Sequence, residues 1–310
     1  MYKKEKIHMK REEVQNIIRD IKSNVESILN DKERYTVCTQ TVKKNNGVEL
    51  EALVIMDKQQ RDGLNVSPTL YLDDVVYDIY DGDITTYQAA EIIVREYYKI
   101  SDSDRQFKKK IEECMNREYI LSHVYPVVVN SDMNQHLICE CPYREFMDML
   151  VIYRVFLESD SVGNIPSFIV KYGLLDNYDI SEDELKTRAD ENLFNQEVSV
   201  LDVDKFLKDH GYADIKEHVK MLVISNETMS YGANVILKLH KILGEHTNAI
   251  IIPSSIHELI AICDVSFGFR HSDEMRQMIE EVNANEVNPA EVLNNHAYLY
   301  NGAKGECELL

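Results

Sequence analysis

The stretch AIIIPSSIHELIAI, residues 249–262, contains the pattern that decides the fold. Two aliphatic-rich runs, 249–252 and 256–262, flank the polar triplet Pro253-Ser254-Ser255. Short apolar runs of this kind are typical of strands, and proline and serine are common in turns. The stretch therefore predicts two adjacent antiparallel strands joined by a turn at residues 253–255.

Further strands and hairpins are predicted before it in the chain. Residues 34–44 and 48–55 flank Asn45-Asn46-Gly47, where Asn46-Gly47 favours the positive φ angles of a tight turn. In the second run Val48, Leu50, Ala52 and Val54 alternate with Glu49, Glu51 and Leu53, which is the period of a strand with one covered face. Residues 149–157 and 165–172 form a second pair around Gly163-Asn164, and residues 221–225 form another strand.

Helices are predicted before, between and after these strands. Apolar residues recur at three- and four-residue steps over 14–29, which indicates an amphipathic helix that covers the first hairpin. Thr85-x-x-Gln88, Ser103-x-x-Gln106 and Ser181-x-x-Glu184 are typical helix starts. Further helices are expected over residues 73–81 before Gly82, 201–210 before Gly211, 235–243 and 275–282.

Hairpins and helices that do not alternate regularly indicate an α+β fold, not a doubly wound parallel sheet. We expect antiparallel hairpins packed against helices, arranged as two subdomains or one large domain. A soft boundary near residue 118 gives an amino-terminal α+β region (1–118: helix, hairpin, helices). The carboxyl-terminal α+β region (119–310) would contain a hairpin, helices and a β-α-β-β-α succession.

Charge and composition narrow the classes of function. The 310 residues carry a formal charge of −20; the first 44 hold eleven Lys and Arg against seven Asp and Glu, or +4, so the remainder carries −24. Such acidity repels phosphate backbones and anionic lipids, so neither nucleic acid nor a membrane is an expected partner. With no signal-like amino terminus, no long apolar run and six scattered cysteines, the sequence predicts a cytoplasmic protein with reduced thiols.

The quoted stretch also contains candidate catalytic residues: Ser254, Ser255, His257 and Glu258. Successive side chains of a strand point to opposite faces, so His257 and Glu258 are not expected to form a dyad. The G-x-S-x-G motif of serine hydrolases and the second histidine of zinc proteases are both missing here. A hydrolase site would need distant residues such as Asp264 or His296.

Glu258 falls on the face that also carries isoleucines. A buried, unpaired carboxylate costs several kcal/mol, so Glu258 is expected to be paired or to lie at the end of its strand.

A second candidate site, for a metal ion, is His136-x-x-Cys139-x-Cys141 with Cys114 upstream. Nitrogen and sulfur ligands suit zinc, but this spacing is not the C-x-x-C knuckle and no second knuckle follows. Phosphate-binding glycine loops are also missing, so no cofactor is expected.

Several phrases in order resemble one protein family: KNNGVEL (44–50), SPTLYL (67–72), LVIS (222–225) with Gly232-Ala233, IIPSSIHELI (251–260) and VNANEVNPAEVLNNHAYLY (282–300). Nearly the whole chain resembles bacterial domain-of-unknown-function family 5688, small cytosolic proteins of Gram-positive bacteria. The resemblance implies no activity, ligand or catalytic residue.

The sequence therefore favours a soluble cytosolic module that binds or regulates another protein without catalysis. Two alternatives stay open: a hydrolase-like enzyme with a site near residues 254–258, and an acidic mimic of nucleic acid. The oligomeric state is left open.

Overall fold

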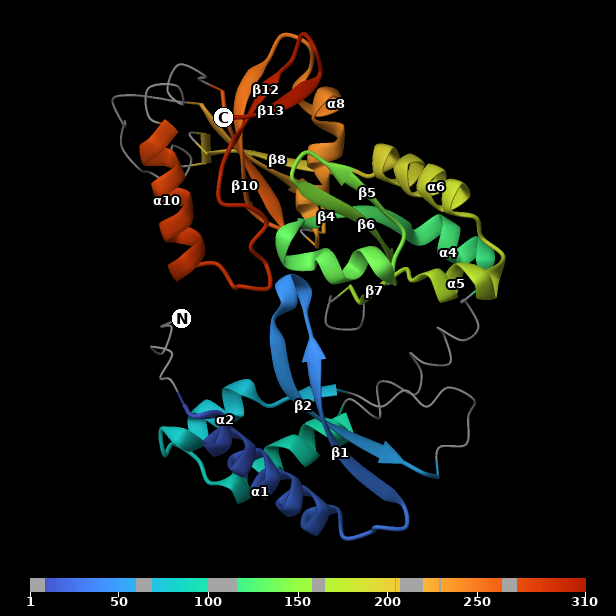
Figure 1. Ribbon diagram of the computed structural model, residues 1–310, viewed down its shortest axis with the longest axis vertical. Coiled ribbons are helices and arrows are strands. Elements are labelled where there is room, and N and C mark those ends of the chain that lie inside the picture. Colours follow the sequence, from blue (N-terminus) through green and yellow to red (C-terminus); the bar gives the residue numbers. More distant parts are fainter. Residues whose placement is uncertain are drawn as a thin grey trace. The chain divides into compact units, whose positions relative to one another are not determined.

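The computed structural model describes residues 9–59, 69–99, 116–157, 165–203, 205–206, 220–228, 230–263 and 272–310 (Figure 1). Its contacts divide the chain into two units, Met1–Lys44 with Val48–Cys114, and Asn45–Gly47 with Met115–Leu310. Both units combine antiparallel strands with helices, which confirms the α+β prediction. Within the described ranges, no helix combines the length and apolar character needed to span a membrane.

The first unit is a three-stranded antiparallel sheet with helices on it. The strand order is β1-β2-β3, and the predicted helix and hairpin are both present. The elements are α1 (Arg11–Leu29), β1 (Tyr35–Lys43), β2 (Glu49–Asp57), β3 (Thr69–Tyr71), α2 (Asp73–Tyr80) and the helical residues 86–99.

The face of β2 that α1 covers is not the face that the alternation in the sequence predicted. Leu53 and Ile55 are fully buried in the core that α1 shares, whereas Leu50 and Val54 are only half-buried. Helix α1 therefore packs on the face that carries Leu53 and Ile55, because these side chains form the larger continuous apolar surface with Leu70 of β3.

Local turn and cap signals were predicted well. Asn46 and Gly47 have φ angles of 60° and 67°, within the short 3-10 turn η1 (Asn45–Gly47). In the capping box, the Gln88 backbone N–H donates to Thr85 Oγ1 at 3.2 Å and the Thr85 N–H donates to Gln88 Oε1 at 2.9 Å. The predicted start at Ser103-x-x-Gln106 lies outside the described residues.

The second unit contains two antiparallel sheets. The larger has the order β13-β12-β10-β11-β9-β8, and in the smaller β6 pairs with β4 on one side and with β5 and β7 on the other. The strands are β4 (Val124–Asn130), β5 (Tyr143–Phe146), β6 (Met149–Phe156), β7 (Ser167–Ile169), β8 (Val198–Asp202), β9 (Met221–Asn226), β10 (Asn248–Ser255), β11 (Glu258–Ile262), β12 (Tyr298–Asn301) and β13 (Glu306–Leu309).

The helices of this unit fill the space between the sheets and cover them. They are α4 (Arg117–His123), η2 (Asp132–Cys139), α5 (Tyr172–Tyr178), α6 (Glu182–Asn195), η3 (Gly232–Lys238), α8 (Leu239–Leu243) and α10 (Ser272–Asn285). The apolar side chains of η3 share one core with the inner faces of both sheets, and α10 packs on the other face of the larger sheet. Met278 and Val282 of α10 are 52% and 45% exposed.

Three predictions in this unit need correction. Pro253-Ser254-Ser255 is not a turn but the end of β10: Ile252 pairs with Ile260 and Ser255 with Glu258, so one extra residue forms a bulge. Proline, which cannot donate a ladder hydrogen bond, is tolerated at a bulge. The turn itself consists of residues 256–257.

The other two corrections concern helices. Residues 232–243 form a 3-10 segment followed by a short α-helix instead of one continuous helix. Residues 201–202, expected to begin a helix, belong to β8, because pairing with β9 overrides their local preference. The bend predicted at Gly163-Asn164 and the helix end predicted at Gly211 lie outside the described residues.

Candidate functional site

The predicted residues 254–258 comprise the end of β10, the tight turn at residues 256–257 and the first residue of β11. The His257 backbone N–H donates to Ser255 Oγ at 3.1 Å, and Ser225 Oγ donates to the His257 carbonyl at 2.7 Å. Gly232 lies directly against this arrangement, since a Cβ there would fall 2.0 Å from Ser225 Oγ and 2.2 Å from the His257 carbonyl oxygen. The Ser255 hydroxyl therefore has a structural role in ordering the turn.

His257 meets a carboxylate from another element. Its Nε2 atom lies 3.6 Å from Oε1 of Glu291, and the two side chains are 37% and 39% exposed. We expected His257 in a strand, but it lies in the turn at residues 256–257. The alternation of strand side chains therefore does not apply to His257 and Glu258. Glu258 is the first residue of β11 and half-buried, which places it at the strand end as expected.

His296, named as a distant residue that a hydrolase would need, pairs with Asp148 in the turn between β5 and β6. Its Nε2 atom lies 2.6 Å from Asp148 Oδ2, although the geometry is not that of a hydrogen bond. Asn294 donates to the same oxygen at 3.0 Å, and the Tyr298 hydroxyl donates to Oδ1. Asp264 lies outside the described residues.

The pKa values of Asp148 and Tyr298, the two ionisable groups that are hydrogen-bonded in this cluster, shift in opposite directions. Burial opposes ionisation of Asp148, but the hydrogen bonds from Tyr298 and Asn294, with the charge of His296, outweigh it and lower the pKa of the carboxyl group. Burial first, and then the bond to Asp148, raises the pKa of Tyr298. The carboxylate is therefore ionised and the phenol neutral near pH 7.

A pocket of about 300 Å³ borders this cluster. His296 lines it together with residues of α10 and the end of the chain: Ser272, Asp273, Met275, Arg276, Ala297, Leu309 and Leu310. An imidazole beside a carboxylate can accept and release a proton, so the pair at this pocket is suited to acid–base chemistry.

The metal candidates do not converge. His136 and Cys139 are exposed, whereas Cys141 is fully buried with Leu137, and this burial raises the pKa of its thiol. Metal binding requires the thiolate, which burial disfavours. Within the described ranges, no three His, Cys, Asp or Glu side chains are placed to hold a metal ion; Cys114 lies outside these ranges.

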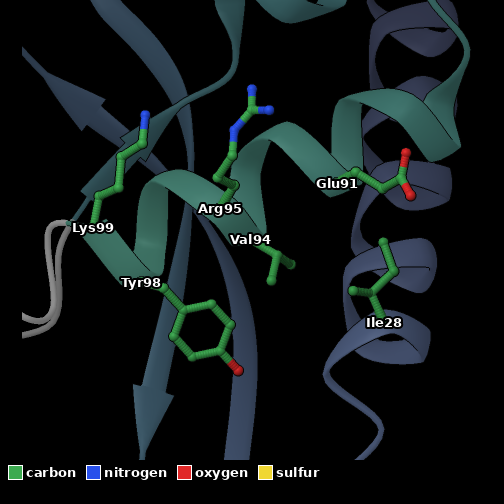
Figure 2. Close-up of a pocket in the computed structure, with 6 residues that line it drawn as sticks. All are labelled: Ile28, Glu91, Val94, Arg95, Tyr98 and Lys99. Atoms are coloured by element: carbon green, nitrogen blue, oxygen red, sulfur yellow. The ribbon is translucent and has the colours of Figure 1, made fainter.

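A pocket of about 500 Å³ lies in the first unit, between α1 and the helix over residues 86–99 (Figure 2). Val94 and Tyr98 point toward one side of this helix, whereas the charged ends of Arg95 and Lys99 point toward the other. Arg95 and Lys99 contact Glu96 at 4.0 and 2.7 Å. The apolar and charged groups are therefore separated, and they do not form a convergent site.

A third pocket, of about 410 Å³, lies beside the edge strand β8 of the larger sheet. Its lining combines apolar, amide and charged side chains from the end of α6, the link to β8, β8 itself, η3 and α8: Asn195, Gln196, Glu197, Val198, Val200, Lys238, Lys241 and Ile242. Lys238 is only 7% exposed and donates to the carbonyl oxygens of Leu193 and Gln196 at 2.7 and 2.6 Å. Sequence reasoning missed this site, although a lysine inside the apolar run VILKLHKIL was a usable signal.

Comparisons with known proteins identify a family. No curated protein and no solved structure matches the chain. The model of a family of unknown function, DUF5688, matches residues 14–302, nearly the whole of the 310 residues. The match agrees with the resemblance noted above, and the chain belongs to this family.

Proposed function

We propose that this protein is a binding module that receives an extended segment of a partner protein along the edge of β8. The observation that carries the proposal is that this strand edge is exposed and uncharged. Ser199, Val200 and Leu201 are consecutive exposed residues, and among the described residues β8 pairs with β9 alone. Alternate residues of an edge strand direct their N–H and C=O groups outward, where another strand can bond to them.

The opposite edge of the same sheet supports this choice. Strand β13 carries exposed Glu306 and Glu308, and charged side chains discourage strand pairing. Strand β8 has no charged side chain before Asp202, while Val200 and Leu201 are 49% and 43% exposed. The neighbouring Phe194 is 57% exposed, which extends the apolar surface onto the end of α6.

Selection from a displayed library of random nine-residue peptides on the full-length protein tests the proposal. We expect enriched peptides whose affinity falls at least tenfold in Val200→Lys. The matched control, Leu309→Lys, places the same charge at an exposed position of the opposite edge and should change nothing. Enriched peptides that bind wild type and Val200→Lys equally would contradict strand addition at β8.

One observation favours hydrolysis as a second candidate function, namely the His296–Asp148 pair beside its pocket. This pair suits the role better than residues 254–258, because Ser255 and the backbone of His257 are engaged in the turn. If it acts, His296→Ala should lower turnover of a susceptible ester at least tenfold, while His246→Ala, at a 93% exposed side chain, should not. A screen of carboxyl and phosphate esters without any turnover that depends on His296 would reject this function.

A further inference from the structure

We propose that the segment received by β8 presents an acidic side chain to Lys238 and Lys241. This inference rests on the proposed function and names the chemistry of the partner. It starts from the pocket beside β8, in which the two lysines lie together with Val198 and Val200 of the strand.

Lys238 is built into this pocket. Its side chain comes from η3, is more than nine-tenths buried, and uses two N–H groups for the carbonyl oxygens at the end of α6. An ammonium group has three N–H donors, so one is left for a further acceptor. Burial, and then the nearby charge of Lys241, lowers the pKa of Lys238 to about 8, so an added negative charge would stabilise its protonated form.

Lys241 supplies the second cation. Its ammonium group donates to the Phe194 carbonyl at 2.6 Å and lies 3.7 Å from the centre of the Phe194 ring. Both lysines therefore gather at the end of α6, where the carbonyl groups hold them in place. A carboxylate between the two ammonium groups would relieve their mutual repulsion.

The geometry of the strand selects a side chain over a chain terminus. Val198 and Val200 lie on the same face of β8 and both line the pocket. A strand added beside β8 would place alternate side chains over this face, so an interior residue of the segment would reach the lysines. The residues two positions away would contact Val198, Val200 or Ile242, which favours apolar side chains there.

Other carboxylates limit how much negative charge the segment can carry. Glu197 lines the same pocket, and its hydrogen bond with Glu227 raises the pKa of Glu227. The chain as a whole carries −20. We therefore expect one acidic residue within an apolar or basic segment, not an acidic run.

The experiment compares peptides selected on full-length wild type with those selected on full-length Lys241→Glu. Wild type should enrich Asp or Glu at one fixed position with apolar residues two positions away, and replacing that acid by its amide should weaken binding at least tenfold. Lys241→Glu should enrich Lys or Arg at the same position. Lys304→Gln, at an exposed lysine of the turn between β12 and β13, is the control and should select the wild-type pattern.

The outcomes separate the two proposals. Peptides that depend on Val200 but show no preference for an acid, or an unchanged preference in Lys241→Glu, would overturn the lysine inference and leave strand addition standing. Enriched peptides that do not depend on Val200, or no enrichment, would overturn both. Lys241 is exposed, so its substitution reverses a charge of the pocket and leaves the two hydrogen bonds that hold Lys238 in place.

Discussion

Gly232 shows how a single missing side chain positions the turn at residues 256–257. A Cβ at this position would overlap Ser225 Oγ and the His257 carbonyl oxygen. The strand and the turn would have to move apart, and overpacking of this kind costs about 1–3 kcal/mol. We therefore expect Gly232→Ala to lower the free energy of unfolding by that amount, measured by urea denaturation.

Gly173 in α5 provides the matched control. Apart from its chain neighbours and the backbone of its own helix, no heavy atom lies within 4 Å of a Cβ built there, so Gly173→Ala should change stability by less than about 1 kcal/mol, in the favourable direction. Equal destabilisation by both substitutions would mean that the close approach at Gly232 is not what matters.

Asp148 should make stability depend on pH in the acid range. Its folded-state pKa lies below the unfolded value of about 3.9, so its stabilising contribution is complete above that value and is lost as the pH falls through the folded pKa. Asp148→Asn should cost on the order of 1 kcal/mol at pH 7, because the carboxylate is 45% exposed and partly screened. The difference from wild type should shrink below about pH 4.

Unfolding titrations at several pH values check this expectation. Asp176→Asn, at an exposed position of α5, is the control and should follow wild type throughout. A difference between Asp148→Asn and wild type that stays constant from pH 7 to pH 3 would contradict the assignment.

At the same scale, the sequence could name reactive residues but not their partners. His296 was singled out, yet its partner Asp148 is far away in the chain, and no spacing connects them. Lys238 interrupts an apolar run, and only the packing of η3 against α6 brings carbonyl acceptors to it. Roles that depend on contacts between distant segments cannot be read from local patterns.

Among the elements, α6 begins with the cap that the sequence predicted. The Ser181 hydroxyl accepts a hydrogen bond from the Glu184 backbone N–H at 3.2 Å, and three acidic residues follow in the first turn. Loss of such a cap typically costs about 1 kcal/mol. We expect Ser181→Ala to lower the free energy of unfolding by this amount, whereas Ser181→Asp should retain most of the wild-type stability. Equal losses in both variants would show that the cap contributes nothing.

Elements specified by neighbouring residues were predicted, and those that depend on pairing were not. The box at Thr85 and Gln88 and the turn at Asn46-Gly47 need only a few residues to form. The bulge at residues 253–254 instead depends on the register between β10 and β11. A proline followed by two serines is compatible with both a turn and a bulge, so composition alone could not distinguish them.

At the scale of the whole molecule, the α+β class followed from the hairpins, but the strand order did not. Strand β10 lies between β11, its neighbour in sequence, and β12, which follows only after α10. Strand β8, the site of the proposed function, is at the edge because nothing described pairs with its outer side. This position results from the assembly of the entire sheet, so the candidate surface could not be predicted from the sequence.

The net charge of −20 belongs to the whole molecule as well. Many of the ion pairs are solvent-exposed and contribute little each, so repulsion among excess carboxylates should dominate the response to salt. Because salt screens this repulsion beyond about 8–10 Å, the unfolding temperature should rise by a few degrees between about 0.01 and 0.15 M NaCl.

A variant with Asp176→Asn, Glu286→Gln and Glu306→Gln, all at exposed positions, changes the net charge from −20 to −17, and its unfolding temperature should respond less to salt. Calorimetric scans at both salt concentrations measure this response, and an unfolding temperature that falls with salt would instead mean that favourable ion pairs outweigh the net repulsion.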